Sequence, residues 1–274
     1  RWCLGEFMDK ELQTRLIFAG VALAIFLPLV VLGGVAFQIV VGVLAMLAVH
    51  ELLRMKGLAT TTLEGMLAML AAFVLAVPIE YYFTFLPIDG NVIAYTLVVF
   101  CLLGSIVVGS NYTFDDVVYP IAVSFYVGSG FNALLDARVA GLNKVLLALL
   151  IVWATDSGAY LFGRRFGMKK LAPTISPNKT VAGALGGIAS AMVVTFIFVL
   201  IDGSVAAPHN RWLLVLYAIF FSIAGQFGDL VESAIKRHYG VKDSGKFIPG
   251  HGGVLDRFDS LLFVFPLMRI LGLF

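Results

Sequence analysis

Long apolar runs alternate along the chain with short polar or glycine-containing segments. We predict a membrane-spanning helix for each run, because a span needs roughly 20 mainly apolar residues. The nine predicted spans cover residues 16–32, 35–53, 66–86, 92–109, 117–131, 145–162, 181–201, 212–227 with an extension to about 235, and 261–273. The fifth and ninth runs are short, and Pro120 weakens the fifth further. Gly33 and Gly34 predict a tight turn between the first two spans.

The overall composition agrees with this pattern. Hydrophobic residues make up 60% of the chain and the mean hydropathy is +0.97, far above the values of soluble domains. The predicted fold class is therefore an all-α, polytopic integral membrane protein. We expect one membrane-embedded unit, in which residues 8–140 form a transmembrane scaffold and residues 141–274 a catalytic region. Residues 1–7 precede Met8 and are expected to be a vector-derived extension, and no cleavable signal peptide is evident.

Lysine and arginine predict the orientation, because cytosolic segments of membrane proteins carry an excess of both. With the N-terminus in the cytosol, the inner segments hold Lys10, Arg15, Arg54, Lys56, Arg164, Arg165, Lys169, Lys170, Lys179, Lys236, Arg237, Lys242, Lys246 and Arg257. The outer segments hold Arg138, Lys144, Arg211 and Arg269. Residues 54–56 and 164–179 are both inside only if an even number of spans separates them, so the weak fifth span is retained. The expected location is the inner (plasma) membrane.

Acidic residues gather toward the inner ends of three predicted spans. They are Asp156 in the sixth span, Asp229 and Glu232 in the eighth, and Asp256 and Asp259 at the start of the ninth. Asp229, Glu232, Ser233 and Lys236 are spaced to share one helix face. A charged group within the membrane costs about 2.5–3.5 kcal/mol on insertion scales. A hydrogen bond between helices explains one such acid, but several at one depth indicate a cation or a wet cavity.

The chemistry of these acids favours Mg²⁺, which takes hard oxygen ligands and is usually held by one or two carboxylates together with substrate phosphates. We expect Asp229 and Asp256 to be the ligands. Asp156, Glu232 and Asp259 would support them or hold a second cation. Zinc is disfavoured, because the four histidines lack ligand spacing and no cysteine pair accompanies them.

Two segments are predicted to contact phosphate. The first, Ser176-Pro177-Asn178-Lys179-Thr180, precedes the seventh span in an inner loop, where a helix N-terminus and a lysine favour an anion. Taken alone, the segment is better explained as a helix N-cap with a lysine for charge balance. The second combines Lys236, Arg237, Lys242, Lys246, His251, Gly252 and Gly253, whose glycines let backbone N–H groups approach an anion. Cytosolic charge preference explains its lysines and arginine but not the interleaved acids and glycines.

Other conspicuous residues have simpler interpretations. Gly183, Gly186 and Gly187 are expected to permit close helix packing on the seventh span. Glu51 and Glu80 lie near the ends of predicted spans and are expected to reach the membrane interface. Neither a G-x-S-x-G nucleophile motif nor a P-loop is present, which argues against a serine hydrolase and a P-loop nucleotidase.

The pattern Ser233-x2-Lys236-Arg237-x4-Lys242-Asp243-x5-Pro249-x-His251-Gly252-Gly253-x2-Asp256-Arg257-x-Asp259 resembles the phosphatidate cytidylyltransferase (CDP-diacylglycerol synthase) family. The 176–180 segment and the surroundings of Asp156 are similar to that family as well. The resemblance is strong over about residues 150–260 and general before them. It implies a membrane enzyme that condenses CTP with phosphatidate to CDP-diacylglycerol and pyrophosphate, with a divalent metal, as a homodimer and for phospholipid synthesis.

The resemblance also implies roles for individual residues. The metal-binding acids fall on Asp229 and Asp256, and Lys179 and Arg257 join them as catalytic residues that hold moving charge. The phosphate contacts fall on Ser176, Asn178, Thr180, Ser233 and the other basic and glycine positions of the pattern. The alternatives are a CTP-dependent lipid kinase of the polyprenol type, with similar substrates, and a secondary transporter, since intramembrane acids also mark ion paths. No nucleic-acid partner is expected.

Overall fold

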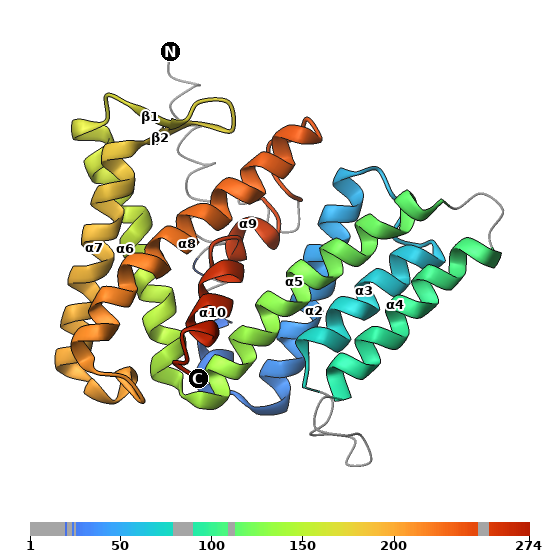
Figure 1. Ribbon diagram of the computed structural model, residues 1–274, viewed down its shortest axis with the longest axis horizontal. Coiled ribbons are helices and arrows are strands. Elements are labelled where there is room, and N and C mark those ends of the chain that lie inside the picture. The colour runs from blue at the N-terminus through green and yellow to red at the C-terminus, as the bar shows by residue number, and fades with distance from the viewer. Residues whose placement is uncertain (1–19, 21–23, 25, 79–89, 109–112, 246–251) are drawn as a thin grey trace.

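The computed structural model describes residues 20, 24, 26–78, 90–108, 113–245 and 252–274 (Figure 1). Its α-helices are α2 (Gly34–Met55), α3 (Leu63–Ala76), α4 (Gly90–Val108), α5 (Phe114–Ala140), α6 (Leu142–Phe166), α7 (Val181–Ile201), α8 (Arg211–His238), α9 (Leu255–Phe258) and α10 (Leu261–Ile270). A 3₁₀ helix, η2 (Gly203–Ala206), joins α7 to α8, and two strands, β1 (Lys170–Ala172) and β2 (Ser176–Thr180), join α6 to α7.

Six of these helices are long and apolar enough to cross a membrane: α2, α4, α5, α6, α7 and α8. The prediction of a helical membrane protein is therefore confirmed, by the length and composition of these six helices. Within the described residues, α3 and α10 have 14 and 10 residues and are shorter than a full span. About half of the first predicted span, 16–32, falls outside the described part of the chain, so the prediction of nine spans stays a prediction.

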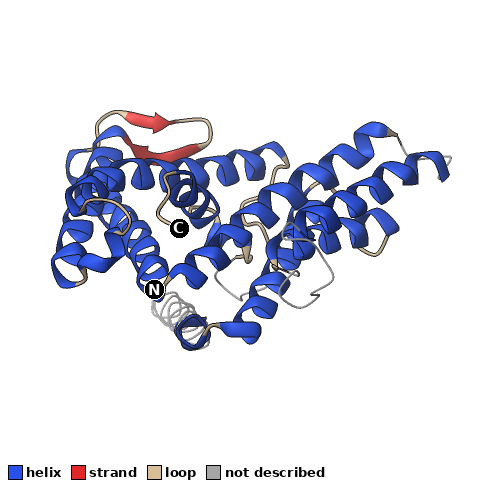
Figure 2. Cartoon of the chain, turned by 60° about the horizontal axis from the view of Figure 1, so that its bottom comes forward, coloured by secondary structure: helices blue, strands red, loops and turns tan. Residues whose placement is uncertain are grey.

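The helices form two groups that meet at α10. Helices α6, α7 and α8 pack together on one side, and α2, α3, α4 and α5 form the other group (Figures 1 and 2). Helix α10 packs against both α5 and α8. Fully buried side chains such as Phe131, Phe221 and Phe265 fill the space between the groups, because the apolar faces of all these helices turn inward there.

Several predicted element boundaries differ from the observed ones. The weak fifth span is in fact the 27-residue helix α5, which tolerates Pro120 inside it and starts at a capping box formed by Thr113 and Asp116. Helix α3 starts earlier than predicted and ends at Ala76, just before Pro78, which disfavours helical geometry in the residue preceding it. The turn predicted at Gly33 and Gly34 is confirmed, since both have positive φ and α2 begins at Gly34.

The segment predicted as an inner loop contains an antiparallel hairpin. Lys170 pairs with Thr180 and Ala172 with Ser176. The alternative interpretation of residues 176–180 as a helix N-cap is confirmed at Thr180, because its hydroxyl accepts a hydrogen bond from the Gly183 N–H at the start of α7. The predicted close packing on α7 is also confirmed: a Cβ on Gly187 would lie 2.8 Å from the Thr155 carbonyl oxygen, and one on Gly186 would collide with Phe162.

The segments predicted to be cytosolic gather at one end of the helices. The C-terminal ends of α2 and α8, the hairpin and α9 lie together there (Figure 1). Hydrogen bonds join them, for example from Arg237 at the end of α8 to the Ile175 carbonyl oxygen in the hairpin (3.4 Å). The connections from α5 to α6 and from α7 to α8 lie at the opposite end (Figure 1).

Three of the cations assigned to the opposite end have structural partners. Arg138 donates to the carbonyl oxygens of Val30 and Val31. The buried ammonium of Lys144 donates to the carbonyl oxygens of Ala207 and Leu273. Arg269 pairs with Asp136 (2.9 Å) and with the Asn132 side chain. These three cations therefore link chain segments at this end of the molecule.

Candidate active site

Asp256 stands at the centre of a network of donors in the site. Its Oδ1 accepts a hydrogen bond from the Lys236 ammonium (2.6 Å). Its Oδ2 accepts from the Ser244 N–H (3.0 Å), the Ser244 hydroxyl (2.8 Å) and the Gly253 N–H (2.7 Å). Burial disfavours the charged carboxylate, but the Glu232 side chain, together with these donors, outweighs it and holds the pKa of Asp256 below its ordinary value. These hydrogen bonds fix Asp256 in one orientation.

Lys236 links Asp256 to a second buried acid. Its ammonium lies 2.6 Å from Glu232 Oε2 as well, one helical turn away on α8. Glu232 is 1% exposed, and its other oxygen, Oε1, has no hydrogen-bond partner. As placed, the Lys236 charge is held by two carboxylates. Its predicted contact with a substrate phosphate stays a prediction.

Glu51 joins the same network from α2, a helix of the predicted scaffold. Its Oε1 accepts from the Val254 N–H (2.8 Å), and its Oε2 accepts from the Leu255 N–H (2.9 Å) and the Ser244 hydroxyl (3.0 Å). Glu51 is 5% exposed. The expectation that it reaches the membrane interface is wrong, because it folds inward to satisfy the first N–H groups of α9. Glu80 lies outside the described residues.

The glycines of this segment make room for the protein's own carboxylates. A Cβ on Gly245 would lie 2.6 Å from Glu51 Oε1, and one on Gly253 would collide with the Glu51 carboxyl group and the Ser244 hydroxyl. Gly252 has φ +80° and lies against Asp256, a backbone conformation that side chains rarely allow. The predicted close approach of backbone N–H groups to an anion is present, and the anions that they contact here are Asp256 and Glu51.

A second pair lies between the hairpin and α8. Lys179 of β2 and Asp229 of α8 form an ion pair with an Nζ–Oδ2 distance of 2.6 Å. Both side chains are about one-third exposed, at 27% and 33%, and the Ser233 hydroxyl donates to the other oxygen of Asp229 (3.3 Å). Lys179 therefore points toward the acids instead of serving only as a loop charge.

Asp156 and Asp259 lie electrostatically between the Lys179–Asp229 pair and the Asp256–Lys236 network. Asp156 on α6 is within reach of the charges of Asp229 and Lys179. Asp259, between α9 and α10, is within reach of Asp229, Asp156 and Lys236. Burial, and next the negative charge of Asp229, raise the pKa of Asp259. A bound cation would favour the ionised form instead.

The acids of the site fit a hard divalent cation by their chemistry. Glu51 and Glu232 are buried, and the side chains of Asp256 and Lys236 are 9% and 13% exposed, so several carboxyl groups lie close to a single ammonium. Glu232 Oε1 is buried without a partner. Among the described residues, no three His, Cys, Asp or Glu side chains are arranged to enclose a metal ion by themselves. This arrangement suits Mg²⁺ that completes its shell with phosphate oxygens and water.

The other predicted residues lie at the same end of the molecule. Ser176 and Asn178 lie in β2, Arg237 in the last turn of α8, Lys242 in the following segment and Arg257 in α9. Lys246 and His251 fall outside the described residues. The structure thus brings the hairpin, the end of α8 and residues 252–259 to one end of the molecule and adds Glu51 from α2.

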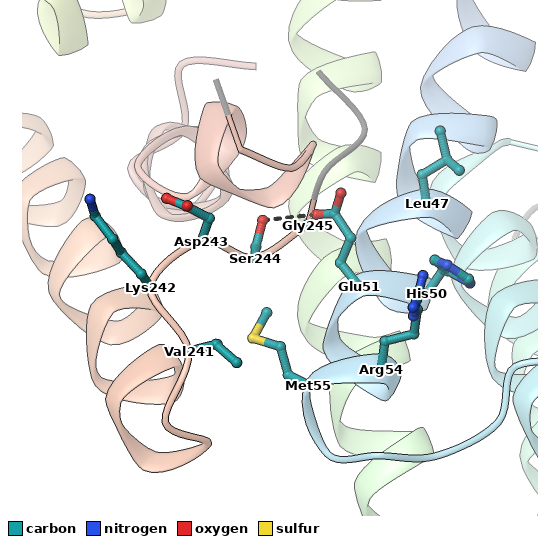
Figure 3. A pocket seen from close by; sticks show the side chains of 10 residues that line it. All are labelled: Leu47, His50, Glu51, Arg54, Met55, Val241, Lys242, Asp243, Ser244 and Gly245. Atoms are coloured by element: carbon teal, nitrogen blue, oxygen red, sulfur yellow. Dashed lines mark hydrogen bonds between the residues drawn. The ribbon is translucent and has the colours of Figure 1, made fainter. Parts of the chain in front are cut away.

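A cavity of about 700 Å³ opens beside this network, between α2 and residues 241–245 (Figure 3). Its lining is Leu47, His50, Glu51, Arg54, Met55, Val241, Lys242, Asp243, Ser244 and Gly245. Figure 3 shows Ser244 and Glu51 facing each other at its edge, joined by their hydrogen bond. Arg54 and Lys242 bring positive charge to this opening, and Glu51 and Asp243 bring negative charge.

The fold and the site define a class: a helical membrane protein with a cluster of carboxylates, lysines and glycines at one end. A family model described as the cytidylyltransferase family matches residues 13–274, and the chain belongs to this family. The chain is 41% identical over 262 residues to "Phosphatidate cytidylyltransferase" of Staphylococcus epidermidis, covering 95% of this chain and 98% of that protein. It is 40% identical over 267 residues to the protein of the same name from Bacillus subtilis, covering 95% and 97%.

Proposed function

We propose that this protein is a phosphatidate cytidylyltransferase, which condenses CTP with phosphatidate to give CDP-diacylglycerol and pyrophosphate. The observation that carries the proposal is the joint placement of Lys179–Asp229 and Lys236–Asp256 at one end of a helical membrane protein. A soluble, highly charged nucleotide and a lipid headgroup can meet only at such an end. Family membership and full-length relatives of that name support the substrates.

The reaction requires no covalent enzyme intermediate. An oxygen of the phosphatidate phosphate attacks the α-phosphorus of CTP in line and forms the new P–O bond. The bond from the α-phosphorus to the oxygen that bridges it to the β-phosphorus breaks, and pyrophosphate leaves with the electron pair. The attacking phosphate is already an anion, so no strong base is needed. Catalysis then consists of positioning and of stabilising charge.

The residues of the site divide this work. Asp229 and Asp256 would hold Mg²⁺, with Asp156, Glu232 and Asp259 beside them; the bound ion would neutralise phosphate charge. Lys179 lies on a hairpin next to the N-terminus of α7, so its ammonium can reach a phosphate oxygen near Asp229. Arg257 and the exposed Lys242 would stabilise charge as it develops on the leaving pyrophosphate.

The orientation follows from the same placement. CTP is cytosolic, so we propose that the site faces the cytosol from the inner (plasma) membrane, with the N-terminus inside and nine spans. The concentration of lysine and arginine at this end supports that orientation. We also propose that the active form is a homodimer, as the family resemblance implies.

Labelling of single cysteines tests this orientation. Starting from a chain with Cys3 and Cys101 replaced by serine, Lys169→Cys and Lys242→Cys should react with a membrane-impermeant thiol reagent only from the cytosolic side. Ala207→Cys, an exposed position beside η2, should react only from outside. Detergent-solubilised samples, in which all three should react, control for accessibility. Labelling of residue 169 or 242 from outside would contradict the orientation, since CTP could not reach the site.

The catalytic proposal is tested by the fate of the CTP phosphorus atoms. A cytidylyltransferase transfers the α-phosphorus to the lipid, whereas a CTP-dependent lipid kinase transfers the γ-phosphorus. Purified protein, Mg²⁺ and phosphatidate should place the α-phosphorus in the lipid product.

A further inference from the structure

Glu51 is the one participant in the network that comes from the N-terminal half of the described chain. Its three hydrogen-bond partners, Ser244, Val254 and Leu255, all follow it by 193 to 204 residues. These partners lie in two chain segments, one at Ser244 and one at residues 253–255. Both segments also contact Asp256, because Ser244 and Gly253 donate to its carboxylate. Glu51 thus contacts both of these segments, which together are called the Asp256 cradle below.

The chemistry of these contacts requires a carboxylate. Two backbone N–H groups and one hydroxyl converge on Glu51, and a carboxylate offers two accepting oxygens to such a set. A glutamine of the same length has one accepting oxygen and would turn its NH₂ group toward a donor. A buried donor left without an acceptor is unfavourable, so the cradle would shift to relieve it.

The position of the Glu51 side chain is also fixed by close packing. Glu51 lies so close to Gly245 and Gly253 that a side chain at either position would collide with it. The Ser244 hydroxyl lies between Glu51 Oε2 (3.0 Å) and Asp256 Oδ2 (2.8 Å), and its single hydrogen can serve only one of them at a time. The orientation of Asp256 is therefore coupled to the acceptor that Glu51 presents.

We infer that Glu51 is a positioning residue for catalysis: through Ser244 and the 253–255 backbone, it sets the orientation in which Asp256 receives the divalent cation. This inference rests on the proposed function of Asp256 as a metal ligand. It extends the site into α2, so the N-terminal helices contribute to catalysis and do not act as scaffold alone.

The test compares Glu51→Gln with Glu64→Gln in full-length, detergent-solubilised protein. Glu64 on α3 is similarly buried (6% exposed), and its Oε2 has no hydrogen-bond partner, so its amide variant removes a buried carboxylate elsewhere. Two quantities are measured: the Mg²⁺ concentration that gives half-maximal activity, and the rise in unfolding temperature on adding Mg²⁺ with CTP. The second is independent of turnover, because a ligand that binds the folded state stabilises it.

For Glu51→Gln we expect the half-maximal Mg²⁺ concentration to rise about 10–100-fold, as is typical when a residue that orients a metal ligand is changed. The Mg²⁺-dependent rise in unfolding temperature should shrink at the same concentrations, while Glu64→Gln should match the unsubstituted protein in both. Ser244→Ala should shift the Mg²⁺ requirement in the same direction. The double variant Glu51→Gln with Ser244→Ala should raise the Mg²⁺ requirement by less than the two single effects combined, because Glu51 acts on Asp256 partly through Ser244.

An unchanged Mg²⁺ requirement in Glu51→Gln would overturn the inference, whether activity is retained or falls only with the fraction of folded protein. The inference and the proposed function fail in different ways. If the unsubstituted protein shows neither Mg²⁺-dependent activity nor Mg²⁺-dependent stabilisation, the proposed metal role of Asp256 is wrong. If it shows both and Glu51→Gln behaves identically, only the role of Glu51 is wrong.

Discussion

Replacing Asp229 with asparagine is expected to abolish turnover while leaving the protein folded. Asp229 is one-third exposed, and its ion pair with Lys179 resembles surface pairs, which contribute about 0.2–1 kcal/mol to stability. Loss of a metal ligand, by contrast, removes several kcal/mol of transition-state stabilisation, or a factor of about 10³ or more in rate. The measurement is kcat with purified protein at saturating CTP, phosphatidate and Mg²⁺, beside the unfolding temperature.

Two companion variants sharpen this expectation. Asp256→Asn should be equally inactive but also less stable, because the Asp256 side chain is only 9% exposed and accepts hydrogen bonds from Lys236, Ser244 and Gly253. Asp202→Asn is the matched control: Asp202 also accepts hydrogen bonds, from Ser204 and Asn143, but at the opposite end of the molecule. It should keep its activity. Near-normal turnover by Asp229→Asn would remove Asp229 from the proposed metal site.

Replacing Lys179 is expected to have the second largest effect. Lys179→Ala removes a proposed point-charge contact to a phosphate oxygen, and loss of one such donor lowers kcat by about 10²–10³-fold. Lys179→Arg keeps the charge but introduces a larger, planar group, so it should also lower kcat, though less. Lys170→Ala, an exposed lysine in the other strand of the hairpin, is the control and should stay active.

A purely structural ion pair makes a different prediction. If Lys179 only balanced Asp229, the double substitution Lys179→Met with Asp229→Asn would remove both charges together and restore activity. We expect the double variant to be as inactive as Asp229→Asn. Full activity in Lys179→Ala and Lys179→Arg would return the segment to its simpler role as a capped helix entry, which Thr180 performs in either case.

The parts of this fold that could be read from the sequence are those governed by local composition. The apolar runs of α6, α7 and α8 mark these helices closely, because lipid-facing helices need continuous apolar length. The hairpin of β1 and β2 was missed because two strands of three and five residues carry little periodicity. Helix α5 was underestimated because Pro120 reads as a helix breaker, although one lost hydrogen bond is tolerated in a helix of 27 residues.

The site was partly predictable for a similar reason. Asp229, Glu232 and Lys236 lie at helical spacing, and Asp256 lies next to glycines, so their chemistry is visible within short stretches. Glu51 gives no such signal, since a single acid near the end of an apolar helix normally reaches the interface. Its partners lie some 200 residues later, and only the packing of α2 against residues 241–255 reveals them. One available clue was Gly245 and Gly253, whose missing side chains imply a close neighbour.

The central claim is that this protein transfers the cytidylyl group of CTP to phosphatidate, and the most direct test follows the phosphorus atoms. Purified protein is incubated with Mg²⁺, phosphatidate and CTP labelled with ³²P at either the α or the γ position, and the lipid and aqueous phases are counted separately. We predict that α label enters the lipid and that γ label appears in pyrophosphate, with Asp229→Asn as the inactive control. The reverse result, γ label in the lipid and α label in soluble CDP, would contradict the account and identify a lipid kinase.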